Sequence, residues 1–163
     1  MFKFKKLNTE VEVASFWEKL YEYHREDAFK DMDEEDKEYF SGRDYYDAIM
    51  DLKGNTSGGQ LPLEMVFVYD ENDKYIGFIM YKIYNKEDGK TFILEFCIDK
   101  SSRNKGIGTQ IAQEFEKYVR IEGATYLAIN TSNENNRRFW QRFGFSETEL
   151  DEWGKMIYTK VIS

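Results

Sequence analysis

The sequence predicts a mixed α/β (α+β) single domain, in which helices flank one central sheet of about six or seven strands. Its length of 163 residues fits one domain. Segments with a helical period alternate along the chain with segments rich in β-branched and aromatic residues. One strand-like segment is followed closely by an amphipathic helix and another strand, which is typical of a sheet packed against helices.

Residues 1–63 are expected to contribute one strand and several helices. "FKFKKL" alternates like a strand, and Asn8 or Thr9 can cap the helix that follows it. The acidic run "DMDEEDKEYF" could be a loop or the first turn of a short helix, and "GRDYYDAIMDL" is expected to form another short helix. "KGNTSGGQLP", with three glycines and the only proline, marks the clearest break in the chain.

Residues 64–163 differ from residues 1–63 in that they contain several segments rich in β-branched and aromatic residues. "EMVFVYD", "YIGFIMYKIYN" and "TFILEFCID" are expected to be strands joined by hairpin turns at "ENDK" and "KEDGK". A helix is predicted from about Gly106 to Glu122, because apolar residues recur at every fourth position from Ile107 to Val119. "TYLAINTS" then predicts a strand, "NENNRRFWQRF" a short helix, and "FSETEL" and "GKMIYTKVI" two final strands.

The composition excludes several classes of protein. Asp and Glu number 31 against 23 Lys and Arg, and the net charge of −8 argues against nucleic acid as the main partner. This charge mildly favours a cationic acceptor such as an amine, although solubility alone explains it. A single cysteine allows no intrachain disulfide. We find neither the apolar run of a signal peptide nor a membrane span, and expect a cytoplasmic protein, monomeric or homodimeric.

The turn "RNKGIG" connects a predicted strand to the predicted helix at Gly106. A helix N-terminus favours phosphate, glycines let a ligand approach the backbone, and Arg103 can add a charge-assisted bond. The turn is not a P-loop, because "GIGT" lacks the lysine. It is not a dinucleotide fingerprint either, because Ile111 stands where the third glycine belongs.

"RNKGIG" matches the Arg/Gln-x-x-Gly-x-Gly signature of the GCN5-related N-acetyltransferases, which bind the pyrophosphate of acetyl-coenzyme A. "NENNRRFWQRFGF", from Asn133 to Phe145, resembles the second conserved segment of that family, and "LEFCID" resembles its central strand. The resemblance covers about residues 64–160 well and residues 1–63 only in outline. It implies a coenzyme-binding core over residues 64–163, with an N-terminal strand and acceptor-side helices over residues 1–63.

The resemblance also implies which residues bind the coenzyme. Backbone N–H groups of residues 104–108 would hold the pyrophosphate beside Arg103, and residues 96–98 would line the pantetheine arm. Asn133 would hydrogen-bond that arm, with Asn136 one turn further along. The full implied set is Phe96, Cys97, Ile98, Arg103, Asn104, Lys105, Gly106, Ile107, Gly108, Thr109, Asn133, Asn136 and Trp140. Arg137, Arg138 and Arg142 could reach the adenosine 3′-phosphate, although a solvated basic helix face is the simpler role for most of them.

Glu95 is the candidate general base. The chemistry that the resemblance implies is direct attack of an amine on a thioester, and the amine must first lose a proton. Glu95 interrupts the apolar run "FILEFCI", and several members of the family use a glutamate at this place as the base. Strict alternation would put it on one face with Ile93 and Cys97, opposite Leu94 and Phe96. The alternative is a structural glutamate that is paired with a basic residue or exposed to solvent.

The general acid is open, because Trp140 stands where many members have a tyrosine. Water, Tyr45 or Tyr126 could replace that tyrosine. His24, the only histidine, is expected to be a surface helix residue. Cys97 is expected to be a small buried hydrophobe and not a nucleophile. No cluster of residues has metal-ligand spacing.

The sequence therefore predicts an acetyl-CoA-dependent N-acetyltransferase that acts on an amine of a small molecule or peptide. The alternative is a catalytically silent acyl-CoA-binding regulatory module, which the missing tyrosine favours slightly. The acidic, tyrosine-containing segment "DMDEEDKEYFSGRDYYDAI" could line the acceptor cleft, although solvated helices are the simpler role for most of its acids.

Overall fold

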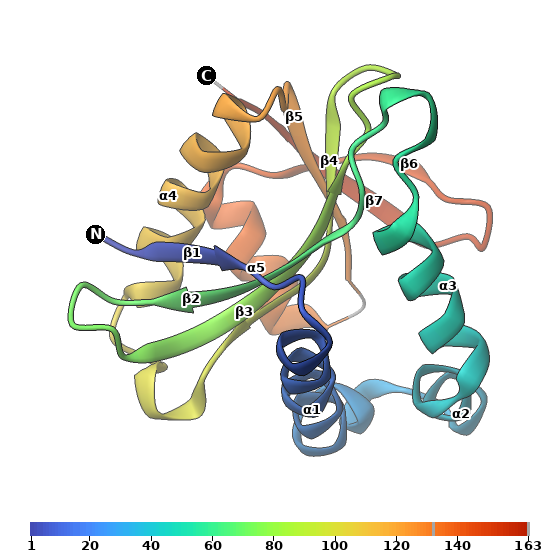
Figure 1. The fold of residues 1–163 in the computed structure, drawn as a ribbon, viewed down its shortest axis with the longest axis horizontal. Helices are drawn as coiled ribbons and strands as arrows, with labels where there is room; N and C mark the ends of the chain where they lie inside the picture. Colours follow the sequence, from blue (N-terminus) through green and yellow to red (C-terminus); the bar gives the residue numbers. More distant parts are fainter. Residues whose placement is uncertain (132, 163) are drawn as a thin grey trace.

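The computed structural model describes residues 1–131 and 133–162, and within them seven strands form one sheet in the order β1-β2-β3-β4-β5-β7-β6 (Figure 1). Among the described strands, only β4 and β5 pair in parallel, whereas every other neighbouring pair is antiparallel. The predicted mixed sheet of six or seven strands is confirmed. The strands are β1 (Lys3–Lys6), β2 (Glu64–Tyr69), β3 (Tyr75–Ile83), β4 (Lys90–Ile98), β5 (Tyr126–Asn130), β6 (Ser146–Leu150) and β7 (Met156–Val161).

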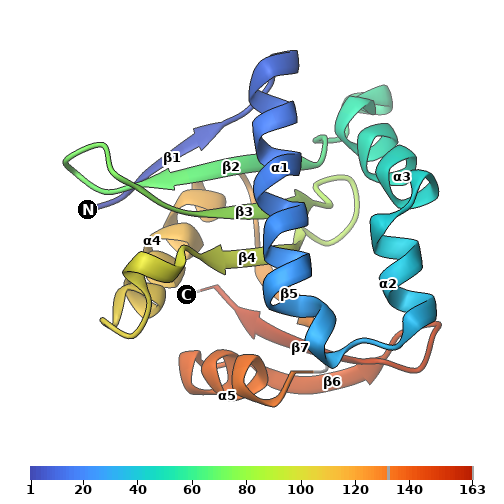
Figure 2. The ribbon, with the colours of Figure 1, turned by 90° about the horizontal axis from the view of Figure 1, so that it is seen from below.

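The helices form two layers, one on each face of the sheet. Figure 2 shows α1, α2 and α3 on one face and α4 and α5 on the other. The helices are α1 (Glu10–Glu26), α2 (Glu34–Ser41), α3 (Arg43–Gly54), α4 (Ile107–Ile121) and α5 (Glu134–Phe143), and the short 3-10 turns are η1 (Ala28–Asp31), η2 (Ser57–Gly59) and η3 (Lys100–Ser102). Among the residues described, no helix is both long enough and apolar enough to cross a membrane.

Local capping explains where the first helices begin. Thr9 caps α1: its hydroxyl accepts the N–H of Glu12 at 3.2 Å, and Glu12 Oε1 accepts the N–H of Thr9 at 3.1 Å. The acidic run that could have been a loop forms α2. Asp33 caps this helix by accepting the N–H of Asp36 at 2.8 Å, and three further acids in its first turn suit the helix dipole.

Each layer of helices buries its own core against the sheet. The α4/α5 core includes Ile111, Phe115, Val119 and Trp140. The α1/α3 core on the opposite face includes Phe16, Leu20, Tyr45 and Ile49. Strands β2 and β3 contribute side chains to both cores because successive side chains point to opposite faces of the sheet. The helix that apolar periodicity predicted from Gly106 to Glu122 is confirmed as α4.

The sheet opens between β4 and β5. These strands share only three residue pairs, Lys90 with Tyr126, Thr91 with Leu127 and Phe92 with Ala128. Beyond Phe92, β4 continues to pair with β3 as far as Ile98, while β5 pairs with β7 as far as Asn130. The carboxyl ends of the two parallel strands therefore diverge, and no strand among the described residues pairs with the β5-side edge of β4 there. Ligands commonly bind at such a place in open sheets.

Candidate active site

The turn before α4 has the backbone geometry of an anion cradle. Asn104 and Gly106 both adopt left-handed conformations, with φ of 63° and 72°. Gly106 is the N-cap of α4, and no side chain caps this end of the helix. A Cβ placed on Gly106 would meet no protein atom within 4 Å, so the space in front of this turn is open. The free N–H groups and the helix dipole at such an end favour a phosphate group.

Gly108 lies where α4, α5 and β4 meet. A Cβ on this residue would lie 3.3 Å from Cε1 of Phe139 and 3.9 Å from Cγ1 of Ile98. The first turn of α4 therefore leaves little space for a side chain between Phe139 on α5 and the end of β4. Ile107 and Thr109, the neighbouring residues of the predicted set, are partly buried and exposed, respectively.

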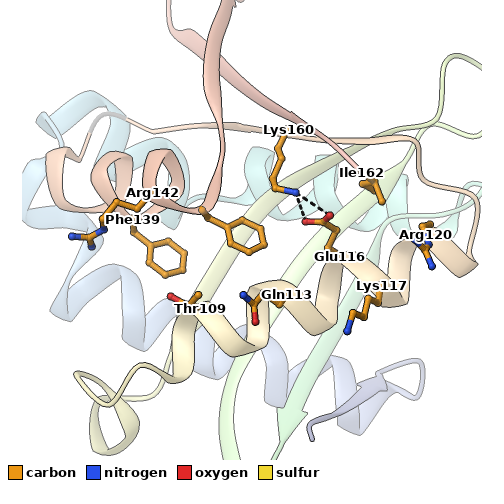
Figure 3. Close-up of a pocket in the computed structure, with 10 residues that line it drawn as sticks. Thr109, Gln113, Glu116, Lys117, Arg120, Phe139, Arg142, Lys160 and Ile162 are labelled. Carbon is orange, nitrogen blue, oxygen red and sulfur yellow. Dashed lines mark hydrogen bonds and ion pairs between the residues drawn. The ribbon is translucent and has the colours of Figure 1, made fainter.

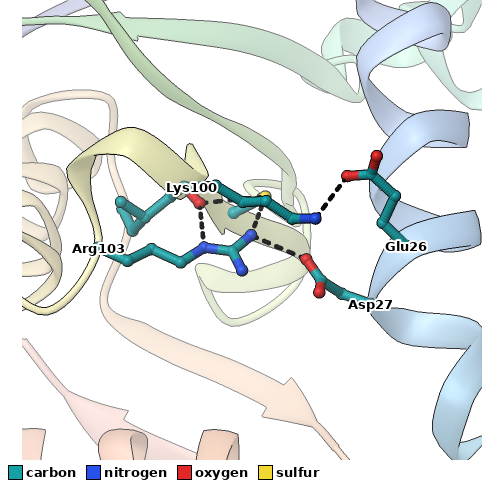
Figure 4. A network of polar contacts seen from close by, with 6 residues as sticks. Glu26, Asp27, Lys100 and Arg103 are labelled. Atoms are coloured by element: carbon teal, nitrogen blue, oxygen red, sulfur yellow. Dashed lines mark hydrogen bonds and ion pairs between the residues drawn. The ribbon is translucent and has the colours of Figure 1, made fainter.

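The basic side chains in and before the turn have different partners. Figure 4 shows Arg103 and Lys100 reaching toward Asp27 and Glu26 at the C-terminal end of α1. Arg103 donates from Nε to the carbonyl of Ile98 at 2.7 Å and from Nη2 to Asp27 Oδ2 at 2.9 Å. Lys105 is exposed and reaches only the carbonyl of Ser101, at 3.3 Å. The Arg103 side chain thus connects β4 to the helices of the opposite layer.

Asn133 uses both ends of its side-chain amide. Its Oδ1 accepts the N–H of Asn136 at 2.9 Å and caps α5, while its Nδ2 donates to Asp31 Oδ2 at 2.6 Å. Asn136 contributes a backbone group to this cap. The turn η1 therefore contacts the start of α5 through Asp31. Asp27, the residue just before η1, contacts Arg103 in the turn before α4.

Trp140 lies in an aromatic cluster beneath α5. It is 7% exposed, and its ring packs edge-on against Phe96 at 5.0 Å, Phe139 at 4.8 Å and Phe145 at 5.2 Å. Phe96 of β4 and the helix α5 are held together by this cluster. The position at which the family often has a tyrosine is thus occupied here by a core residue.

A β-bulge in β4 determines the direction of Glu95. Met80 of β3 pairs with Glu95, whereas the next residue, Tyr81, pairs with Ile93, so Leu94 has no partner on β3. An extra residue of this kind re-aims the side chains beside it. The alternation prediction is therefore partly wrong. Ile93 lies in the α4/α5 core, while Leu94, Cys97 and Glu95 lie on the side of α1.

His24 is buried against Glu95, and the prediction of a surface residue is wrong. The His24 side chain is 1% exposed, and its Nε2 lies 3.1 Å from Glu95 Oε1. The sequence contained a signal for this: His24 continues the row of Phe16 and Leu20 at intervals of four residues on α1. The Glu95 side chain keeps 17% exposure, so it is not sealed from solvent.

The two candidate tyrosines lie in different places. Tyr45 of α3 is buried in the α1/α3 core, and burial together with the charge of Glu95 raises the pKa of its hydroxyl. Tyr126 begins β5, where β4 and β5 still pair, and its hydroxyl donates to Asp88 at 2.7 Å. Burial and this hydrogen bond raise the pKa of Tyr126 to about 12. Of the two, Tyr45 is the one whose pKa the charge of Glu95 raises.

Cys97 is a buried free thiol, as expected. It is 8% exposed, and burial raises the pKa of its thiol to about 12. Because the thiolate is the nucleophile, this environment makes Cys97 unreactive. Within the described part of the chain, no group of three or more His, Cys, Asp or Glu residues could hold a metal ion.

A groove of about 670 Å³ runs between α4, α5 and the end of β7, a size typical of small-molecule sites (Figure 3). Lys160 Nζ donates to both carboxylate oxygens of Glu116 in it, at 2.9 and 2.8 Å. The groove is lined by Thr109, Gln113, Glu116, Lys117, Arg120, Phe139, Arg142, Phe143, Lys160 and Ile162. Sequence reasoning had named only Thr109 and Arg142 among these. The polar row Thr109, Gln113 and Lys117, at intervals of four on α4, is the signal that could have found the groove.

Of the other two arginines of α5, Arg138 pairs with Glu134 at 2.9 Å and Arg137 lies 3.8 Å from the same carboxylate. These contacts fit the solvated helix face that was the simpler expectation for them.

Comparison with known proteins agrees with this architecture. YycN of Bacillus subtilis has a similar structure, with a TM-score of 0.71 at 17% identity over 93% of this chain and 96% of that chain. The PaiA N-acetyltransferase of Thermoplasma acidophilum, solved in complex with coenzyme A, has a TM-score of 0.68 at 21% identity over 99% of each chain. GCN5 of Tetrahymena has a TM-score of 0.66 at 15% identity over 99% of this chain and 96% of that chain. The comparison with curated proteins found no match.

The family model "Acetyltransferase (GNAT) family" matches residues 17–145, most of the chain. The matched range contains the strands β4 and β5 that diverge, the uncapped turn before α4 and the helix α5. The open space at Gly106 and the unpaired edge of β4 suit the family's elongated, phosphate-bearing coenzyme. The chain therefore belongs to the GNAT family of acetyltransferases, and its cofactor is acetyl-CoA.

Proposed function

We propose that this acetyltransferase is an N-acetyltransferase that acts on an amine of a small molecule or peptide. The observation that carries the proposal is the position of Glu95. A carboxylate lies on β4 where this strand diverges from β5, faces the α1 layer, and keeps 17% exposure. A partly solvated carboxylate at the open end of the sheet is suited to accept a proton from an incoming amine.

The coenzyme would lie along three features of the chain. The N–H groups of residues 104–108 would hold its pyrophosphate at the uncapped end of α4. The unpaired edge of β4 at residues 96–98 would pair with the amides of its pantetheine arm, as an added strand does. The groove between α4 and α5, with Lys117 and Arg142 on its wall, would take the adenosine 3′-phosphate.

This placement leaves residues 64–163 as the coenzyme-binding part and residues 1–63 as the acceptor side. Glu95 faces α1, and Asp27 and Asp31 lie at the end of the same layer. Carboxylates in this region suit an acceptor that arrives as a cation. We therefore expect the amine to approach from the side of α1 and η1.

The reaction needs two proton transfers, one from the amine and one to the leaving sulfur. A lysine-like amine has a reference pKa of about 10.4 and arrives protonated at neutral pH. Glu95 would accept that proton, directly or through a water molecule. When bound, acetyl-CoA supplies a thioester whose acetyl carbon forms the new C–N bond as the C–S bond breaks. The indole N–H of Trp140 cannot deliver a proton to the sulfur, and burial together with the charge of Glu95 raises the pKa of Tyr45 and makes it a weaker acid. The departing thiolate would therefore take its proton from water.

The second candidate function is a catalytically silent acyl-CoA-binding module. The presence of Trp140 in place of the usual tyrosine favours it, because an indole N–H does not transfer a proton to a leaving group. The leaving thiol has a reference pKa of about 8.5, so loss of the tyrosine need not stop the reaction. The two candidates share coenzyme binding and differ in turnover.

Two measurements test the proposal in sequence. Acetyl-CoA at a hundredfold excess over its dissociation constant should stabilise the protein by about 2.7 kcal/mol, with no shift from NAD. CoA release is then followed with spermidine, kanamycin, lysine and a tetrapeptide with a free N-terminus. Release with one of these amines that is lost in Glu95→Gln supports the enzyme. Release by any amine rules out the silent module, and release that persists unchanged in Glu95→Gln removes Glu95 as the base.

A further inference from the structure

We infer that His24 is a positioning residue that donates a hydrogen bond from Nε2 to Glu95 and fixes the carboxylate for proton transfer. This inference rests on the proposed function, in which Glu95 is the base. The two residues are 71 positions apart in sequence, and their contact joins the last turn of α1 to β4 at 3.1 Å.

His24 occupies a position that packing alone would give to an apolar residue. It follows Phe16 and Leu20 on the buried row of α1, and its side chain is 1% exposed. Its ring stacks on Phe29 at 5.4 Å with an interplanar angle of 25° and meets Phe40 edge-on at 5.8 Å. A leucine would continue the row without burying polar atoms. The imidazole is therefore explained by its contact with Glu95 and not by the surrounding rings.

The surroundings of the ring determine which nitrogen carries the proton. Nδ1 is buried and has no hydrogen-bond partner among the described residues. A proton on Nδ1 would leave a buried donor without an acceptor, both in the Nδ1–H tautomer and in a doubly protonated ring. A proton on Nε2 alone points at Glu95 Oε1 and leaves Nδ1 as an unshared lone pair. The Nε2–H form is thus the one that fits, and His24 donates to Glu95.

Because His24 donates this hydrogen bond and Glu95 accepts it, the two side chains have different roles. Nε2 already carries its proton, so His24 cannot also take the proton of the amine. Oε1 of Glu95 is engaged, whereas Oε2 makes no hydrogen bond with the described residues of the protein. Because the Glu95 side chain is partly exposed, Oε2 is the oxygen available to the acceptor or to a bridging water. His24 therefore holds one oxygen so that the other keeps a single orientation.

The first test reads the proton directly and needs no substrate. The chain contains one histidine, so protein labelled with 15N-histidine gives one pair of imidazole nitrogen signals. Long-range 1H–15N correlation should find the proton on Nε2 and Nδ1 bare, and Glu95→Gln should shift the Nε2–H signal. A proton on Nδ1, or rapid averaging of the two tautomers as in a free imidazole, would overturn the inference.

The second test distinguishes the effect of the His24 N–H donor from the effect of its aromatic ring. His24→Gln keeps an N–H donor at similar reach, whereas His24→Phe keeps an aromatic ring and removes the donor. With the fastest amine of the four in the proposed assay, His24→Phe should lower kcat on the order of tenfold with an unchanged KM for acetyl-CoA, and His24→Gln should recover most of the loss. His24→Leu, which extends the apolar row, replaces His24→Phe if the larger ring prevents folding.

A double-mutant cycle connects the effect to Glu95. In a Glu95→Gln background, His24→Phe should cause no further loss, because the group that it positions is already gone. Additive losses, a wild-type kcat in His24→Phe, or equal losses in the Gln and Phe variants would each overturn the positioning role. Failure of the proposed function looks different: Glu95→Gln would then turn over at the wild-type rate, whatever His24→Phe does, and the NMR contact would survive as a structural one.

Discussion

The proposed coenzyme side and the proposed acceptor side of this molecule are built in different ways. The coenzyme side uses a continuous stretch, from the end of β4 through the glycine turn to α4, and it presents backbone N–H groups. The acceptor side depends on contacts between distant residues. His24 meets Glu95 across 71 positions, Asp27 meets Arg103 across 76, and Asp31 meets Asn133 across 102.

This difference explains why a coenzyme site can be recognised from a short motif, whereas an acceptor site cannot. Backbone N–H groups are positioned by φ and ψ, which a few neighbouring residues determine. A carboxylate acquires a role only from what packs against it. We therefore expect a change in the glycine turn to abolish coenzyme binding, a change at Glu95 to alter turnover, and a change at Asp27, which holds Arg103, to alter coenzyme affinity.

The largest effect is expected from Gly108→Glu. A Cβ here already lies 3.3 Å from Phe139, and a carboxylate at the first turn of α4 would occupy and repel the pyrophosphate site. Thermal stabilisation by acetyl-CoA should disappear while the variant stays folded. Gly54→Glu is the matched control, because it adds the same group at the end of α3 where no atom lies within 4 Å. Retained affinity in a folded Gly108→Glu protein would contradict the position of the cradle.

Glu95→Gln should lower turnover by about 100-fold and leave the affinity for acetyl-CoA near normal, because only proton transfer is lost. Initial rates with the active amine, together with a coenzyme titration, measure the two quantities separately. Glu147→Gln on the exposed strand β6 makes the same change away from the site. An equal loss in coenzyme affinity would mean that Glu95 belongs to the coenzyme side.

The thiol of Cys97 on β4 provides a test of whether this strand is buried as the structure describes. Its pKa is raised from 9.0 to about 12, so the folded protein keeps a proton that the unfolded chain loses above pH 9. Stability is therefore expected to fall as the pH rises through this window, and at pH 10 the loss from this group is about 1.4 kcal/mol. Urea unfolding of wild type and Cys97→Ala at pH 8 and pH 10 isolates it, since the buried tyrosines titrate in both proteins. Equal losses in the two proteins would mean that the thiol is not buried as described.

The smallest effect is expected from Asp27→Asn. Asp27 holds the Arg103 guanidinium at 2.9 Å, and both side chains are partly exposed. Removing this charge should free Arg103 and tighten acetyl-CoA binding about threefold, within the range of partly exposed ion pairs. Glu26→Gln removes an equal charge from Lys100 and is the control, for which we expect a smaller change. If both variants tighten binding equally, general charge and not the Asp27–Arg103 pair is responsible.

Local patterns in the sequence predicted much of the coenzyme side. The interval of four residues predicted α4, the glycines predicted the turn before it, and Thr9 was one of two expected caps. The β-branched and aromatic segments predicted the strands, including β6 and β7. These features follow from the chain itself, because helix period, strand alternation, capping and left-handed turns depend on residues a few positions apart.

Tertiary structure alone decided what surrounds Glu95. The bulge at Leu94 breaks the alternation that placed Ile93 on one face with Glu95. No pattern in the neighbouring sequence predicts a bulge there. The burial of His24 depends on where α1 crosses the sheet and on the rings of η1 and α2 that close over it. By itself the sequence determined a family, a sheet and a glycine turn before α4. The partner of the Glu95 carboxylate was decided by packing between elements far apart in the chain, because a buried polar pair forms only where two such elements meet.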